Sequence, residues 1–245
     1  MIQLTQFKDK LVEELWLPTT QKWGNVLRPR AKKIRKLRLL TLTSDVSFEE
    51  VTKFEKEELT QRECVVAWNF SYFKKLRLET EISPAKVFGP PRYENCASSA
   101  SFPIKEYFPF DVINLDFSSQ DPAFEAGRIE KEIVSVENTI KLQKIKGSDS
   151  FILVYTTVLN ANDLDYEGLV QTSNSIPASG WLGLPSEEFP VKIGKQEEKM
   201  RCIETVVSKM CSKYGYNCKT EMKDIPIRKD NRYVIYSVAV LACGG

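Results

Sequence analysis

Hydrophobic residues follow two different patterns, which take turns along the chain. Some form short continuous apolar runs, which are typical of strands buried on both faces of a parallel sheet. Others recur every three or four positions, which is typical of amphipathic helices. Strands are expected at 37–43, 64–68, 85–88, 110–117 and 151–155. Helices are expected at 7–16, from 47 to 59, at 71–79, from 129 to a terminator at 147, and at 200–214.

Local signals set the expected ends of these helices. Ser47 and Glu50 form a capping box, in which two side chains satisfy backbone N–H groups of the first helical turn. Pro18 is expected to end the first helix, because proline lacks an N–H and its ring clashes with the preceding turn. Gly147 and Gly215 follow the last apolar positions of two helices and are expected to terminate them.

The last two apolar runs form a separate feature. The runs 216–227 and 233–242 are joined by only five polar residues, 228–232. So short a connection cannot make a parallel crossover, and the last strand is therefore expected to be antiparallel. Five strand–helix alternations followed by this hairpin predict an α/β protein with a single open, mostly parallel seven-stranded sheet flanked by helices. We divide the chain into an N-terminal helix and basic segment, 1–36, and an α/β domain, 37–245.

Composition excludes several kinds of chemistry. The chain has no His, which removes the commonest general base, the Ser-His-Asp and Cys-His systems and the commonest metal ligand. Six Cys are present, but none forms a C-x-x-C pair, so no metal site and no thioredoxin-type site is expected. The sequence contains no signal peptide and no apolar run of membrane length. A cytoplasmic protein with reduced thiols and no membrane association is the expectation.

Positive charge is local rather than global. The net charge is only +2, yet a basic cluster precedes the first strand. We interpret its members as candidate contacts to nucleic-acid phosphates, with the alternative that the cluster is simply solvated surface. The candidate residues are Arg28, Arg30, Lys32, Lys33, Arg35 and Lys36.

The strand at 110–117 carries the main candidate site. It ends on Asp116, followed by the aromatic Phe117. In open parallel sheets, ligands bind beyond the carboxyl ends of the strands, which is where Asp116 is expected to lie. The alternative is a structural carboxylate that caps the next loop. Phe117 has two interpretations as well, a ring that stacks on a ligand or a residue of the core.

The order of elements, the acidic end of the fourth strand and the closing hairpin resemble the class I S-adenosylmethionine-dependent methyltransferases over roughly residues 37–242. The segment 114–117 has the Asn and aromatic spacing of the D/N/S-P-P-Y/F/W tetrapeptide of amino-group methyltransferases, without the prolines. In a second register, 115–117 resembles the Leu-Asp-Pro-Phe-Gly segment of tRNA guanine dimethyltransferases, and we favour this register because it leaves Asp116 at the strand end. The resemblance implies catalytic roles: Asp116 orients an amino nitrogen, and Phe117 stacks on the base.

The resemblance also implies an S-adenosylmethionine site at the ends of the first two strands. Its residues would be Thr43, Ser44, Asp45 and Asn69. The family's glycine-rich turn is replaced here by 41–46, which contains no Gly, and its acidic residue after the second strand is replaced by Asn69. Ser44 and Asp45 have an alternative role as helix caps, for which both residue types are preferred.

Two functions remain open at this stage. The first is a methyltransferase-like protein with an atypical cofactor site that acts on or binds nucleic acid. The second is a non-catalytic module with the same fold that binds a partner, for instance another protein. A different nucleotide-binding α/β protein ranks last, because neither a Gly-x-x-x-x-Gly-Lys nor a Gly-x-Gly-x-x-Gly motif is present.

Overall fold

The computed structural model describes most of the expected elements. The described residues are 4–27, 36–43, 49–61, 64–69, 86–88, 108–118, 128–160, 196–226 and 233–244. The expected helix 71–79 and the capping residue Ser47 lie outside them.

Seven strands form one sheet in the order β3-β2-β1-β4-β5-β7-β6. They are β1 (Leu39–Thr43), β2 (Val65–Asn69), β3 (Lys86–Phe88), β4 (Val112–Asp116), β5 (Ser150–Asn160), β6 (Tyr216–Pro226) and β7 (Tyr233–Gly244). The strands β1 to β5 pair in parallel, whereas β7 is antiparallel to both β5 and β6. The open, mostly parallel seven-stranded sheet with a closing antiparallel hairpin is therefore confirmed.

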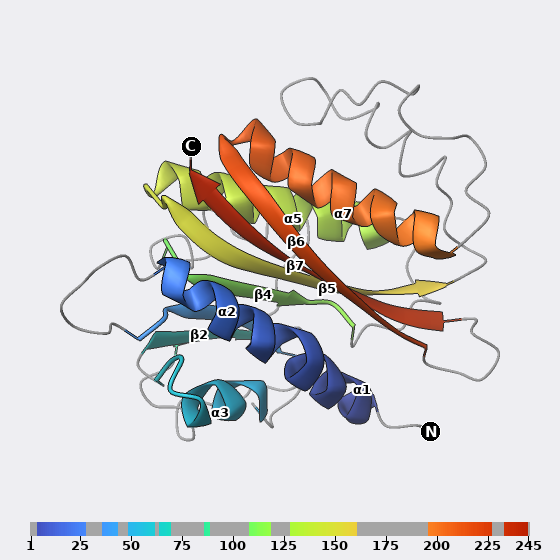
Figure 1. The fold of residues 1–245 in the computed structure, drawn as a ribbon, viewed down its shortest axis with the longest axis horizontal. Coiled ribbons are helices and arrows are strands. Elements are labelled where there is room, and N and C mark those ends of the chain that lie inside the picture. Colours follow the sequence, from blue (N-terminus) through green and yellow to red (C-terminus); the bar gives the residue numbers. More distant parts are fainter. Residues whose placement is uncertain are drawn as a thin grey trace.

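Helices cover both faces of this sheet (Figure 1). One face carries a continuous helical segment formed by α1 (Leu4–Leu11), the π-helical turn η1 (Val12–Trp16) and α2 (Leu17–Leu27), together with α3 (Glu49–Lys56). The other face carries α5 (Arg128–Ile145) and α7 (Gln196–Lys213). Gly147 and Gly215 follow the last two helices with φ of 75° and 78°, the left-handed conformation expected of C-terminal caps.

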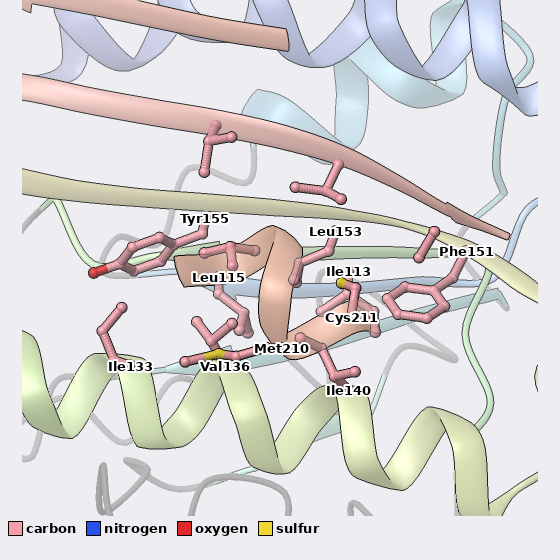
Figure 2. Close-up of a cluster of buried hydrophobic side chains, with 14 of the residues drawn as sticks. Ile113, Leu115, Ile133, Val136, Ile140, Phe151, Leu153, Tyr155, Met210 and Cys211 are labelled. Carbon is pink, nitrogen blue, oxygen red and sulfur yellow. The ribbon is translucent and has the colours of Figure 1, made fainter. Parts of the chain in front are cut away.

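The alternation of side chains along β4 assigns each residue to one of two cores. Ile113, Leu115 and Phe117 point toward α5 and α7, whereas Val112 packs on the side of the N-terminal helices. Figure 2 shows Ile113 and Leu115 facing the inner side of α5 together with residues of β5. Since successive strand residues point to opposite faces, Asn114 and Asp116 lie on the face that the N-terminal helices cover. This assignment decides which helix reaches the candidate site.

Pro18 does not end the first helix, contrary to the sequence-based expectation. The helical segment continues through it to Leu27. Immediately before the proline, the backbone widens into η1, where the Leu17 N–H donates to the carbonyl of Val12, five residues back. A π-turn of this kind rearranges the carbonyls of the preceding turn, with which a proline ring would otherwise clash. The Thr19 hydroxyl also donates to the carbonyl of Leu15, which supports the turn from the side chain.

A buried hydrogen-bond chain ties the N-terminal helices to the sheet. Trp16 Nε1 donates to Ser237 Oγ over 3.1 Å, and Ser237 Oγ lies 2.6 Å from Thr156 Oγ1. All three residues are essentially inaccessible to solvent. The N-terminal helical segment thus shares both the apolar core and the polar contacts of the sheet.

Replacing Ser237 by alanine is expected to lower the free energy of unfolding by about 1–3 kcal/mol, because the buried Trp16 N–H and Thr156 hydroxyl lose their partner. Urea denaturation monitored by circular dichroism measures the change. Ser212→Ala is the matched control, since the Ser212 hydroxyl donates only to the Ser208 carbonyl on the exposed side of α7. An equal effect of the two substitutions would contradict the prediction.

No helix among the described residues is both long and apolar enough to cross a membrane. Within the same residues, no group of three potential metal ligands is found, and Cys64, Cys211, Cys218 and Cys243 form no disulfide.

Candidate functional site

The carboxyl ends of β1, β2 and β4 lie at one edge of the sheet. Thr43 of β1 is in register with Asn69 of β2, and Thr41 of β1 is in register with Asn114 of β4. Asp116, two residues beyond Asn114, is the last residue of β4. The backbone thus brings together three of the expected site positions, Thr43, Asn69 and Asp116. Ser44 and Asp45 lie outside the described residues, as do the side chains of Thr43 and Asn69.

Asp116 is 3% exposed and its two carboxylate oxygens have different partners. Oδ1 accepts two hydrogen bonds from Ser118, one from the backbone N–H at 3.0 Å and one from the hydroxyl at 2.5 Å. A carboxylate that bonds the backbone two residues ahead in this way holds the start of the following loop. Oδ2 lies 3.4 Å from the Nζ of Lys8, which belongs to α1. The Asp116 side chain therefore both caps the following loop, as expected, and contacts a nitrogen cation, the Lys8 ammonium.

Lys8 connects Asp116 to a second buried carboxylate. Its Nζ lies 3.3 Å from Oε1 of Glu50, in the first turn of α3, and Glu50 is 3% exposed. Apart from this ion pair, Glu50 Oε1 has no hydrogen-bond partner among the described residues. Burial acts to lower the pKa of the Lys8 ammonium, but its attraction to Glu50 and Asp116 outweighs burial and raises that pKa above the usual value. We call Lys8, Glu50 and Asp116 the Lys8 cluster.

A further polar group lies beside the Lys8 cluster on the same face of β4. Asn114 is 4% exposed, and its Nδ2 donates to Thr41 Oγ1 over 3.3 Å. Its Oδ1 has no hydrogen-bond partner among the described residues. An unsatisfied buried acceptor is costly, and natural proteins keep few of them. The face of β4 that carries Asp116 therefore also carries an unsatisfied acceptor, Asn114 Oδ1, two residues earlier in the strand.

Further ion pairs join α1 and η1 to α3 and to β6. Lys53 of α3 lies 2.9 Å from both Asp9 and Glu13, and Lys223 of β6 lies 2.5 Å from Glu14. These pairs are partly or largely exposed, in contrast to the Lys8 cluster. In Figure 1 the N-terminal helices cross the sheet, with α1 toward the carboxyl ends of β4 and β5.

Phe117 lies on the opposite face from Asp116. Its side chain is fully buried and packs edge-on against Tyr155, with ring centroids 5.9 Å apart. The Phe117 N–H donates to the carbonyl of Thr156 over 2.8 Å, so the backbone still continues the sheet there. No face of the ring is open to a base in this structure, and its stacking role stays a prediction.

The basic cluster lies, as far as it is described, at the other edge of the sheet. Arg28, Arg30, Lys32, Lys33 and Arg35 are outside the described residues. Lys36 precedes β1 and donates to the carbonyl of Glu58 over 2.8 Å, with the Glu58 carboxylate at 3.8 Å. With a rise of about 3.3 Å per residue, the five residues of β1 separate its two ends by about 13 Å. Lys36 and Asp116 thus lie at opposite ends of the parallel strands.

Two residues of the site were missed by the sequence interpretation. Glu50 was assigned only to a capping box, and Lys8 only to an amphipathic helix. The position of Lys8 opposite the carboxylates of Glu50 and Asp116 depends on how α1 docks against the sheet. A charged residue among the apolar positions of the first helix was the only signal that the sequence offered.

With Lys8 in place, the carboxylates of Glu50 and Asp116 cannot hold the cation of the cofactor that the resemblance implies. S-adenosylmethionine carries a sulfonium cation and an ammonium, for which buried carboxylates are suitable partners. Here the Lys8 ammonium already lies at ion-pair distance from both carboxylates. A cofactor cation and Lys8 cannot occupy that position together.

Among the described strands β7 alone is antiparallel, and this sheet order is that of the class I methyltransferases. The chain has a methyltransferase-like fold. Neither protein-family models nor curated protein sequences gave a match to the chain.

Solved structures of methyltransferases resemble the fold of this chain at low identity. The methyltransferase domain of bacterial CtHen1 matches with 13% identity and a TM-score of 0.44, over 93% of this chain and 99% of that one. The plantazolicin methyltransferase BpumL, in complex with a desmethyl analogue and SAH, matches with 11% identity and a TM-score of 0.46, over 98% and 89%. M. jannaschii TYW2 in complex with AdoMet matches with 9% identity and a TM-score of 0.42, over 91% and 75%.

Proposed function

We propose that the chain is a methyltransferase-like protein that binds S-adenosylmethionine at the carboxyl ends of β1, β2 and β4. In this proposal Asp116 orients an amino nitrogen of the acceptor. The observation that carries the proposal is the placement of the Asp116 carboxylate. Ser118 fixes Oδ1 with two hydrogen bonds, and Oδ2 remains directed at a nitrogen, the Lys8 Nζ at 3.4 Å.

The chemical part that Asp116 would play follows from this geometry. A carboxylate oxygen held in one position accepts a hydrogen bond from an amino N–H and thereby fixes the direction of the nitrogen lone pair. Ser118 keeps the carboxylate from rotating, because both of its donors are directed at Oδ1. The arrangement supports positioning of a nitrogen, and Lys8 would have to leave before an acceptor could take its place.

Nucleic acid is the acceptor that we propose, on the basis of the basic cluster before β1. Its members neutralise phosphates in this proposal, which predicts binding that weakens as salt is raised. Because Lys36 and Asp116 are at opposite ends of the strands, a single nucleic acid would have to extend along the length of the strands to reach both. A binding role at one edge and a catalytic role at the other are therefore separable by mutation.

A cofactor titration tests the proposal. Isothermal titration of S-adenosylmethionine into the full chain is expected to give saturable heat below millimolar concentration. Asn69→Asp restores the acidic residue typical of the family after the second strand. It is expected to tighten binding by about tenfold, since a charged acceptor adds about 1.4 kcal/mol to a ribose hydrogen bond.

The matched control is Asn217→Asp, which makes the same charge change at an exposed position of β6. It is expected to leave cofactor binding unchanged. Absence of heat at millimolar S-adenosylmethionine in the wild type and in Asn69→Asp would refute the proposal that the protein binds this cofactor.

The second candidate is a non-catalytic methyltransferase-fold module that binds a partner. Both oxygens of Asp116 are engaged within the chain, Oδ1 by Ser118 and Oδ2 by Lys8, which favours this candidate. It predicts that the protein binds no adenosyl compound while remaining fully folded. The titration described above, combined with a thermal melt of the same sample, separates the two functions.

A further inference from the structure

Two cysteines lie on either side of the turn that joins α7 to β6. Cys211 belongs to the last turn of α7, and Cys218 is the third residue of β6. Between them the chain reverses direction at Gly215, whose φ of 78° is the left-handed conformation of a helix C-terminal cap. The reversal brings the start of β6 back along the end of α7, and the two elements are in contact.

The Cys218 side chain contacts the part of α7 that the Cys211 side chain covers. Cys218 Sγ lies 3.9 Å from the carbonyl oxygen of Ser208, three residues before Cys211. A helical side chain leans toward the N-terminus of its helix, so the Cys211 thiol lies over the turn around Ser208. Both cysteines pack in the core between the sheet and the helices α5 and α7, where Figure 2 shows Cys211. There the two thiols interact with each other as hydrogen-bond donor and acceptor.

The two thiols differ in their access to solvent and in their acidity. Cys211 has no exposed surface, whereas Cys218 is partly exposed and lies between two exposed residues, Asn217 and Lys219. The hydrogen bond from Cys211 outweighs partial burial and lowers the pKa of the Cys218 thiol. The same hydrogen bond, together with burial, raises the pKa of Cys211. Because the thiolate is the reactive form, Cys218 is the sulfur that an oxidant from solution reaches and attacks first.

We infer that Cys218 and Cys211 are a site of reversible oxidation by peroxides, at which the two thiols become a disulfide that joins β6 to α7. In the first step the Cys218 sulfur attacks one peroxide oxygen. An S–O bond forms, the O–O bond breaks, and the other oxygen leaves with the thiol proton as water or an alcohol. The Cys211 sulfur then attacks the sulfur of this sulfenic acid. The S–S bond forms, the S–O bond breaks, and the oxygen leaves as water with the proton of Cys211. The cysteine pair loses two hydrogens, and the peroxide is reduced.

Cys243 is the alternative partner for Cys218, and its position makes it a control. It lies on β7 in register with Asn217, the residue before Cys218. Its side chain packs against the core on the face that the N-terminal helices cover, whereas Cys218 packs against the core of α5 and α7. The sheet therefore separates Cys243 from Cys218, while Cys211 lies on the same face as Cys218.

The oxidation site is distinct from the candidate site at Asp116. Cys243 is in register both with Asn217 of β6 and with Ser150, the first residue of β5. Asp116 is in register with Thr156, six residues further along β5 and thus about 20 Å away along the strand. The inference therefore does not depend on the proposed function.

Peptide mapping of the folded wild-type chain tests the pair, because cleavage after Lys and Arg leaves each cysteine in a peptide of its own. The protein is treated with equimolar hydrogen peroxide, blocked with N-ethylmaleimide and digested with trypsin without reductant. We expect peptide 210–213 to be linked to peptide 214–219, with a mass lower by two hydrogens than their sum, and dithiothreitol to separate them. Linkage of Cys218 to Cys243, or oxidation of other cysteines while Cys218 stays reduced, would overturn the inference.

Single substitutions assign the two roles. Cys211→Ala removes the second sulfur, so peroxide is expected to leave a sulfenic acid on Cys218 that dimedone labels, whereas wild type shows no such label. Cys218→Ser is expected to leave Cys211 reduced, because Cys211 is buried. Cys243→Ser is the matched control and is expected to form the same linked peptides as wild type. Equal dimedone labelling of Cys218 in wild type and Cys211→Ala, or loss of the linked peptides in Cys243→Ser, would overturn the inference.

Discussion

Replacing Lys8 by methionine is expected to lower the free energy of unfolding by about 3–5 kcal/mol at pH 7. Methionine retains the length and most of the apolar contacts of the lysine stem, so the change is mainly the loss of the ammonium. The carboxylates of Glu50 and Asp116 then remain buried, close to a common point, with no cation between them. A buried charge that loses its partner is far more costly than the pair was beneficial. Urea denaturation at constant ionic strength gives the difference.

A triple variant distinguishes the loss of the attraction to Lys8 from the cost of leaving two carboxylates buried without a counter-charge. Lys8→Met combined with Glu50→Met and Asp116→Asn removes all three charges and keeps an oxygen acceptor for Ser118. We expect it to regain most of the stability that Lys8→Met loses, because no unpaired charge stays buried. Lys10→Met, with its exposed side chain, is expected to change the free energy by less than about 0.5 kcal/mol. A triple variant as unstable as the single one would contradict this explanation.

The pH dependence of the Lys8→Met effect has a definite sign. The carboxylates raise the pKa of Lys8 above 10.5, so its stabilising contribution is fully present below pH 10.5. The contribution is lost only as the pH rises through the raised value. Burial raises the pKa of Tyr216 to about 12 as well, but this residue is the same in both proteins and its effect cancels in their difference. The stability difference between wild type and Lys8→Met is therefore expected to be constant from pH 7 to pH 10 and to shrink above pH 10.5. Shrinkage below pH 9 would contradict the assignment.

The sequence predicted the sheet well, since a parallel sheet buried on both faces requires continuous apolar runs. All seven expected strands are present, and the short 228–232 connection correctly predicted that β7 is antiparallel. The main error at strand level is the end of β5, which continues to Asn160 rather than stopping at Tyr155. Thr156 and Thr157 interrupt the apolar run, yet they are buried and suit a strand, and Thr156 Oγ1 lies 2.6 Å from Ser237 Oγ.

The candidate site was predictable only in part, for a physical reason. Asp116 could be assigned to the end of β4, because a strand end is a local property of the sequence. Its contact with Lys8 depends on the path of the N-terminal helices, and Pro18 was expected to stop that path. The π-turn before Pro18 let the helix continue across the sheet, and no local propensity signals such a turn. The ion cluster therefore came from tertiary packing alone.

Phe117→Ala is expected to lower the free energy of unfolding by about 3–5 kcal/mol. The ring has no exposed surface and packs edge-on against Tyr155 within the core beneath α5 and α7. Truncation removes these contacts and leaves a cavity that the rigid strands around it can fill only partly. A residue whose main role is to stack on a base would instead be exposed in the free protein, and its removal would cost little stability.

Phe151→Ala is the matched substitution for Phe117→Ala. Phe151 is equally buried in the same core and packs edge-on against Tyr216 at 5.1 Å, but it lies at the start of β5 rather than next to Asp116. Similar losses for the two variants in urea denaturation would establish Phe117 as a core residue. The milder Phe117→Leu keeps most of the volume and is expected to cost less than about 1.5 kcal/mol, so that the protein stays folded for titration. If Phe117→Leu leaves stability nearly intact but abolishes binding of single-stranded nucleic acid, the core assignment fails. The ring must then leave the core to reach a base, because in this structure it faces α5 while Asp116 faces Lys8.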